Sequence, residues 1–193
     1  KYLLYIKTAK TGGTSFVDYL NQIKNIKIYK RINNVKLLEN LKEGDIIMVV
    51  NDNLNEFKKK YKKIFVESYK IMISRNPYTK TLSCYNYHPL SKNKDLVQLL
   101  MNKKNLTYDS TAIDYKLNAP KSLWNNYSLF THFYLKQTFS LVENEKLLVD
   151  KVIRFENLQC DINNLFSELK IDINNLKLKH LNSTSYKYHL EDV

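Results

Sequence analysis

The sequence predicts an α/β fold in three layers, with a central parallel sheet flanked by helices. Short apolar runs alternate with amphipathic helical patterns along most of the chain, which is typical of a parallel sheet. The 193 residues are 44% hydrophobic and 26% charged, as in ordinary globular domains. We therefore expect one domain over residues 1–193. The chain opens inside an expected strand, so we also expect it to be trimmed at both ends.

The first expected unit is a strand, a loop and a helix. Tyr2 to Lys7 is a short run rich in leucine and aromatic residues, followed by a turn over Thr8 to Gly13. A helical pattern then begins near Thr14. Its expected buried face consists of Phe16, Tyr19, Leu20 and Ile23.

Two further strands follow. The second strand is expected at Asp45 to Val50, which is apolar after its first residue, as is typical of a strand covered on both faces. A lysine-rich helix is expected from Leu54 to Lys63. Tyr69 to Ser74 is the third strand. Pro77 follows it at a position that the first turn of a helix tolerates.

The last part of the chain contains one more expected strand and helix. Residues 89–136 are polar with scattered aromatics, which indicates a variable, substrate-facing region. A strand near Val152 to Phe155 then precedes an amphipathic helix. The apolar face of that helix consists of Leu158, Ile162, Leu165, Phe166 and Leu169.

The charge of the chain favours an anionic ligand. There are 31 basic and 19 acidic residues, giving a net charge of +12. Nearly all of the cations are lysines, so a solvated lysine-rich surface is an equal alternative. Cys84 and Cys160 are far apart and lack metal-ligand spacing, so we expect two buried thiols and no metal. No apolar run approaches the roughly 20 residues of a membrane-spanning helix.

A pair of glycines marks a candidate anion-binding loop. Gly12 and Gly13 are two of the three glycines in the chain, and they lie between an expected strand and an expected helix. Such a loop lets backbone N–H groups approach a phosphate-like group at a helix N-terminus. Lys10 precedes the glycines and no glycine lies upstream, so this is not the GxxxxGK[ST] loop of nucleotide triphosphatases. A simple tight turn is the alternative.

Arg75 lies at the end of another expected strand, where open α/β sheets bind their ligands. In a chain dominated by lysine, an arginine there indicates bidentate binding of a phosphate. Ser83, two helical turns further on, could add a hydroxyl group. The alternative is an ordinary helix that begins at Pro77 beside a surface arginine.

Together these segments resemble the PAPS-dependent sulfotransferases, in particular the carbohydrate-directed Golgi type and its bacterial relatives. The segment Ala9 to Ser15 is similar to the family motif PKTGGTS, with Ala9 in place of proline. Arg75, Asn76, Pro77, Ser83 and Tyr85 are similar to RNPxxRxxSxY, with Lys80 in place of the second arginine. Weaker matches cover residues 152–158 and 180–184.

The resemblance implies a P-loop-like fold and a transferase that moves sulfonate from PAPS to an acceptor hydroxyl, without a metal. Lys10 would stabilise the leaving oxygen, and Arg75 and Ser83 would hold the 3′-phosphate. The donor loop itself would be formed by Lys10, Thr11, Gly12, Gly13, Thr14 and Ser15. The acceptor implied by the carbohydrate-directed relatives is a glycan, with no dedicated nucleic acid partner.

The general base departs from the family pattern. Many relatives carry a histidine at the end of the second strand, where this chain has Asn51 and Asp52. Asp52 could accept the proton of the acceptor, or it could cap the following helix. His88 and His132 are the other candidates.

Two other functions stay open at this point. The first is a basic module that binds nucleic acid or acidic glycans without catalysis, which the net charge and the many tyrosines among the lysines favour. The second is a kinase on the same fold, which the order of the loop motif disfavours. The chain is expected to be a soluble domain, cytoplasmic in a bacterium or virus and Golgi-lumenal in a eukaryote.

Overall fold

The computed structural model describes residues 2–23, 27–30, 41–42, 44–50, 54–87, 96, 137–138, 141–173 and 176–179. The chain divides into two compact units. The first comprises Lys1–Arg75 and Gln137–Asn182, and the second comprises Asn76–Lys136 and Ser183–Val193. The first unit contains the sheet, and the described part of the second contains helix α4 (Pro77–Tyr87).

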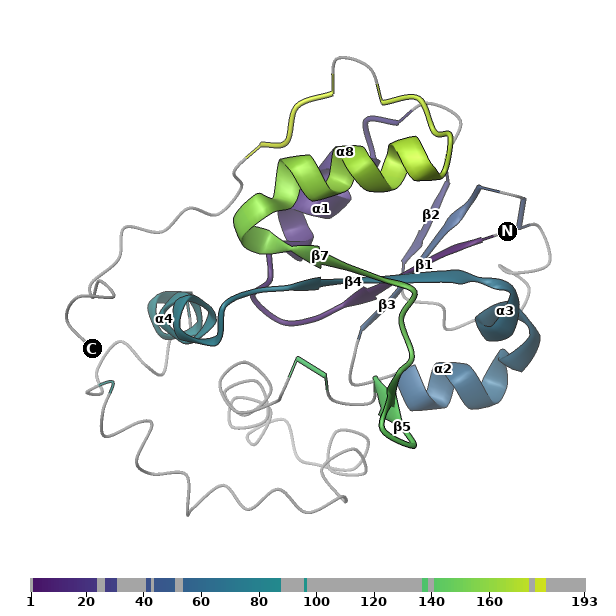
Figure 1. The fold of residues 1–193 in the computed structure, drawn as a ribbon, viewed down its shortest axis with the longest axis horizontal. Helices are drawn as coiled ribbons and strands as arrows, with labels where there is room; N and C mark the ends of the chain where they lie inside the picture. Colours follow the sequence, from purple (N-terminus) through teal and green to yellow (C-terminus); the bar gives the residue numbers. More distant parts are fainter. Residues whose placement is uncertain are drawn as a thin grey trace. The chain divides into compact units, whose positions relative to one another are not determined.

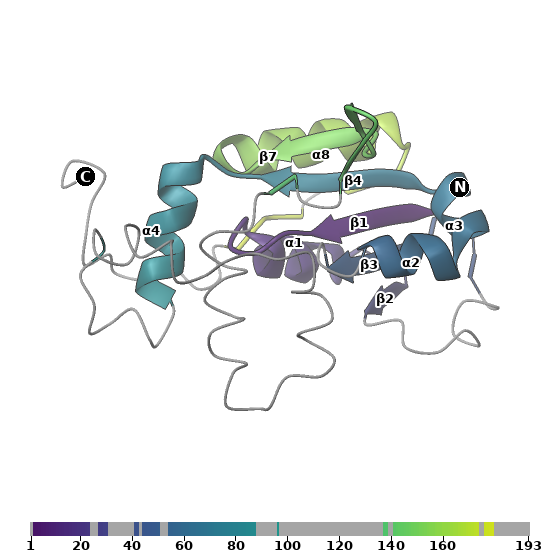
Figure 2. The same ribbon diagram turned by 90° about the horizontal axis from the view of Figure 1, so that it is seen from below.

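The first unit is built on a parallel five-stranded sheet. Its order is β2 (Ile28–Lys30), β3 (Ile46–Val50), β1 (Leu3–Lys7), β4 (Tyr69–Ser74) and β7 (Lys151–Arg154). Figure 2 shows these strands side by side and pointing the same way. The mixed α/β fold with a central parallel sheet is confirmed, and the carboxyl ends of β1, β4 and β7 therefore share one edge.

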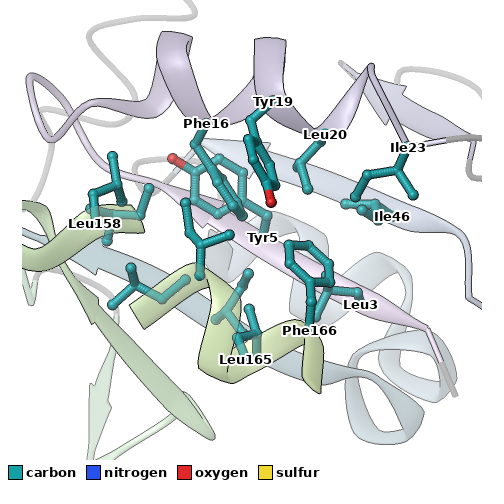
Figure 3. Close-up of a cluster of buried hydrophobic side chains, with 14 residues drawn as sticks. Leu3, Tyr5, Phe16, Tyr19, Leu20, Ile23, Ile46, Leu158, Leu165 and Phe166 are labelled. Carbon is teal, nitrogen blue, oxygen red and sulfur yellow. The ribbon is translucent and has the colours of Figure 1, made fainter. Parts of the chain in front are cut away.

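One face of the sheet is covered by α1 (Gly13–Leu20) and α8 (Leu158–Glu168) (Figure 1). Figure 3 shows Phe16, Tyr19 and Leu20 reaching from α1 towards β1, with Leu165 and Phe166 of α8 nearby. The rings of Tyr5 and Phe16 meet edge to face at 4.8 Å between centroids. The buried faces predicted for both helices are confirmed, with Leu169 partly buried just after α8.

The opposite face is covered by α2 (Leu54–Lys60) and α3 (Lys62–Glu67) (Figure 1). The sequence predicted one helix here, but the chain leaves helical geometry at Tyr61, whose φ of −124° and ψ of 46° interrupt it. Leu54, Phe57 and Phe65 are buried on both sides of this break. The break lets both short helices direct apolar side chains to the sheet.

Several short elements were not predicted. They are β2, the hairpin of β5 (Val142–Glu143) and β6 (Lys146–Leu147), and the 3-10 turn η6 (Phe155–Asn157). The hairpin residues are exposed, and its turn residues Asn144 and Glu145 have positive φ of 49° and 63°. Elements of two or three residues are too short to show an apolar pattern, so sequence periodicity does not reveal them.

The prediction of two buried thiols was wrong for one of them. Cys84 is buried, but Cys160 is exposed. Cys160 lies on α8 away from the face formed by Leu158, Ile162 and Leu165, and therefore points to solvent. Within the described ranges, no helix is long and apolar enough to cross a membrane.

Candidate anion-binding site

The loop between β1 and α1 has an unusual backbone. Lys10 has a positive φ of 58°, and Gly12, which precedes the first residue of α1, has a φ of 81°. Glycine adopts this conformation without cost, whereas for lysine it is strained by about 1–2 kcal/mol. A strained lysine in a loop that faces a helix N-terminus is consistent with a functional role.

Two threonines fasten the loop to the sheet. The Thr8 hydroxyl donates to the carbonyl oxygen of Ile73 on β4, at 2.9 Å, and lies 2.8 Å from the Thr11 hydroxyl. Both threonines are buried. The Thr11 side chain is therefore turned into the protein, and only its backbone remains to serve a ligand.

The two glycines allow close approach of other side chains. A Cβ on Gly12 would lie 2.6 Å from ring carbons of Phe155, and a Cβ on Gly13 would lie 2.7 Å from the hydroxyl of Tyr5. Contacts this short do not occur between real side chains. The loop therefore requires glycine at both positions for packing, and at Gly12 also for backbone geometry.

The first turn of α1 supplies hydrogen-bond donors to the site. Gly13 and Thr14 are the first two residues of α1, and the first N–H groups of a helix point out of its N-terminus, because they have no carbonyl one turn earlier in the helix. Gly12 provides no side-chain cap. The Thr14 side chain is exposed and that of Ser15 is buried. The positive end of α1 and its N–H groups can thus bind a phosphate- or sulfate-like anion.

Arg75 follows β4 directly and contacts this loop. Its Nη1 donates to the carbonyl oxygen of Lys10 at 3.2 Å, and its guanidinium lies 4.3 Å from the centroid of the Phe155 ring. The sequence placed Lys10 and Arg75 at neighbouring strand ends, and the structure brings them together.

Two contacts of Arg75 were not predicted. The side-chain amide of Gln137 accepts from Arg75 N at 2.8 Å and donates to Arg75 O at 2.6 Å. Phe155 lies under its guanidinium. No feature of the sequence around Gln137 indicates this role. Phe155, by contrast, directly follows strand β7, as Arg75 directly follows strand β4, so its position at a strand end was a usable signal.

Helix α4 of the second unit contains the rest of the second motif. The Asn76 carboxamide accepts from Tyr78 N at 2.9 Å, and Pro77 is the first helical residue, so Asn76 and Pro77 start the helix. Ser83 and Lys80 are buried within α4. Burial lowers the pKa of Lys80.

The candidate bases lie outside the described residues. These are Asp52, His88 and His132, and the expected variable region 89–136 and the segment 180–184 are likewise not described, apart from Leu96. In the described part of the chain, no three His, Cys, Asp or Glu side chains are grouped as metal ligands.

The chain has the fold of sulfotransferases. It is similar to the crystal structure of a sulfotransferase from Alicyclobacillus acidocaldarius, with a TM-score of 0.54 and 13% identity over 95% of this chain and 87% of that one. It also aligns with mouse sulfotransferase SULT7A1 complexed with PAP, with a TM-score of 0.46 and 16% identity, covering 91% of this chain and 60% of that one. No protein-family model and no curated protein sequence matches the chain.

Proposed function

We propose that the protein is a sulfotransferase that takes sulfonate from PAPS and transfers it to a hydroxyl group of a carbohydrate. The observation that carries this proposal is the loop from Lys10 to Ser15, with its two obligate glycines at the N-terminus of α1. The sulfotransferase fold and the similarity of this loop to PKTGGTS support it.

In this proposal the loop binds the 5′-phosphosulfate of the donor. The backbone N–H groups from Thr11 to Ser15 hold the anionic oxygens, and the Lys10 ammonium stabilises the bridging oxygen as negative charge develops on it. The acceptor oxygen forms a bond to sulfur while the bond from sulfur to the bridging oxygen breaks. The products are the sulfated acceptor and adenosine 3′,5′-bisphosphate.

Arg75 and Ser83 hold the 3′-phosphate in this proposal. The Arg75 guanidinium donates to the Lys10 carbonyl oxygen, and its planar fork of N–H donors is suited to bidentate binding of a phosphate. Binding of the 3′-phosphate would thus be linked through Arg75 to the loop that binds the other end of the donor.

Asp52 accepts the acceptor's proton in this proposal. It follows the carboxyl end of β3, the strand next to β1, and lies 75 − 52 = 23 residues before Arg75. A carboxylate there needs hydrogen-bond reach and a pKa suited to proton transfer. The alternatives are His88 and His132.

A transfer assay tests the proposal. PAPS labelled in the sulfonate is incubated with the protein and a pool of glycans, and covalent label is measured together with adenosine 3′,5′-bisphosphate. We expect equal amounts of both products, and a loss of both in Lys10→Ala. Equal yields from the variant, or no bisphosphate with any acceptor, would contradict the proposal.

A polyanion-binding function is the second candidate, and one surface favours it. Lys59 and Lys60 at the end of α2 and Lys62 and Lys63 at the start of α3 are all exposed. A surface of this kind binds acidic polymers through counterion release, and its affinity falls steeply with salt. The replacement of these four lysines by glutamine separates the two functions, because it would abolish polyanion binding and leave sulfonate transfer unchanged.

A further inference from the structure

The ring of Phe155 contacts the two parts of the candidate site that come from different strands. A Cβ on Gly12 would lie 2.6 Å from its Cδ2 and Cε2 atoms, so the backbone of Gly12 rests directly against the ring. The guanidinium of Arg75 lies 4.3 Å from the ring centroid. One aromatic side chain therefore supports both the glycine turn and the arginine.

The sheet register places Phe155 beside Arg75. Ser74 of β4 pairs with Arg154 of β7, so Arg75 and Phe155 are the next residues beyond two neighbouring parallel strands. The Asp161 carboxylate accepts from Arg154 N at 2.9 Å and from the Arg154 guanidinium at 3.1 Å. These bonds hold the residue that precedes Phe155.

The position of Arg75 determines how the loop backbone is turned. Arg75 Nη1 donates to the carbonyl oxygen of Lys10. In a trans peptide the C=O and N–H groups point in opposite directions, so this bond directs the N–H of Thr11 away from Arg75. The same peptide follows Lys10, whose positive φ has to be maintained by its surroundings.

We propose that Phe155 is a positioning residue of the donor site, which holds Arg75 and Gly12 so that the loop is preorganised for an anion. This inference rests on the proposed function for the identity of the anion, the 5′-phosphosulfate of PAPS. The ring supports the guanidinium through a cation–π contact and the Gly12 turn through van der Waals contact.

The test compares Phe155→Leu with Phe166→Leu. Phe166 belongs to the same apolar cluster, but its ring stacks on Tyr19 and not on the loop. Phe166→Leu is therefore the control for the loss of packing that any phenylalanine-to-leucine change in this cluster causes. Calorimetry of adenosine 3′,5′-bisphosphate should give about 3- to 10-fold weaker binding for Phe155→Leu and unchanged binding for Phe166→Leu. Phe155→Tyr keeps the ring and should restore the affinity.

A second measurement does not depend on the donor. Hydrogen exchange of loop residues 8–15 in the unliganded protein should be faster in Phe155→Leu than in Phe166→Leu. Combining Phe155→Leu with Arg75→Lys should give a smaller effect than the sum of the two single changes, because both act on one contact. If Phe155→Leu does not fold, Arg75→Lys alone must accelerate the loop exchange.

The outcomes separate this inference from the proposed function. Equal donor affinity and equal loop exchange in Phe155→Leu and Phe166→Leu would overturn the role of Phe155 even where the protein transfers sulfonate. Faster, non-additive loop exchange in a protein that does not bind the bisphosphate would support the role of Phe155 and overturn the choice of donor.

Discussion

Gly13 lies directly against the hydroxyl of Tyr5, the central residue of strand β1. A Cβ on Gly13 would come within 2.7 Å of Tyr5 Oη and within 3.1 Å of two carbons of the Lys7 side chain. The Tyr5 hydroxyl is fully buried and has no hydrogen-bond partner among the described residues. The start of α1 is thus placed as close to the sheet as a glycine allows.

Gly13→Ala is therefore expected to lower the free energy of unfolding by about 1–3 kcal/mol, because the new methyl group overpacks this contact. Tyr5→Phe removes the oxygen that the methyl would meet, so the double variant should recover part of the loss. Tyr5→Phe alone should leave the stability unchanged or raise it by about 1 kcal/mol, since the lost hydroxyl made no bond. Urea unfolding measures all three, with Thr14→Ala, at the exposed position of the same turn, as a control. Additive losses in the double variant would mean that the two residues do not contact one another.

The Lys10 side chain should favour catalysis, whereas its positive φ should lower the stability of the fold. Lys10→Ala and Lys10→Gly should both lose about 2.7–4 kcal/mol of transition-state stabilisation, measured as kcat/KM for PAPS, with little loss of donor affinity. The free energy of unfolding of Lys10→Gly should exceed that of Lys10→Ala by about 1 kcal/mol, because glycine adopts the positive φ of 58° without strain. By contrast, Arg75→Ala should mainly weaken donor binding. Near-parental turnover in Lys10→Gly would remove the lysine from the mechanism.

Asp161 makes the stability depend on pH in the acid range. Hydrogen bonds from Arg154 lower the pKa of the Asp161 carboxyl, and the partial desolvation of that carboxyl opposes this effect. A lowered pKa gives stability that is complete above the unfolded value of about 3.9 and is lost as the pH falls through the folded value. At pH 7 the free energy of unfolding of the wild type should exceed that of Asp161→Asn by at most about 1 kcal/mol. The difference is small because the Arg154 side chain is 62% exposed and solvent screens the ion pair. Thermal unfolding between pH 2 and 7, at about 0.1 M salt, measures the difference. A difference that persisted unchanged below pH 3 would contradict the ion pair as its cause.

Asp52→Asn tests the proposed base. The amide keeps the size of the side chain and much of its ability to cap α2, but it has no basicity, so turnover should fall by about 10²–10⁴-fold while the fold is retained. Steady-state kinetics with thermal unfolding on the same samples gives both quantities. An unchanged rate in a folded variant would leave capping as the role of Asp52, and His88→Gln and His132→Gln would then be measured.

The strands and the loop could be predicted because their patterns are local. The apolar run Tyr69–Ser74 is a strand with the predicted bounds, and the loop with Gly12 and Gly13 connects strand β1 to helix α1 as predicted. The helix start at Pro77 was likewise predicted correctly. Each of these features depends on a few neighbouring residues.

The contacts around Arg75 could not be predicted, because they depend on residues far apart in the chain. Gln137 is 62 residues from Arg75, and its two hydrogen bonds to the Arg75 backbone leave no trace in local composition. Phe155 matched a weak motif without an assigned role. Its role emerges only from the pairing of β4 with β7, which places it next to Arg75.

A calorimetric titration of the wild-type chain with adenosine 3′,5′-bisphosphate at about 50 mM and about 200 mM salt, with ATP as the comparison, tests the proposed donor site directly. We predict one bisphosphate bound per chain, binding that survives the higher salt, and weaker binding of ATP, because in the proposed site the loop and Arg75 bind two separate phosphate groups. Equal affinity for ATP and the bisphosphate would contradict the proposed donor site. Binding that has no defined stoichiometry and is lost at the higher salt would contradict it as well.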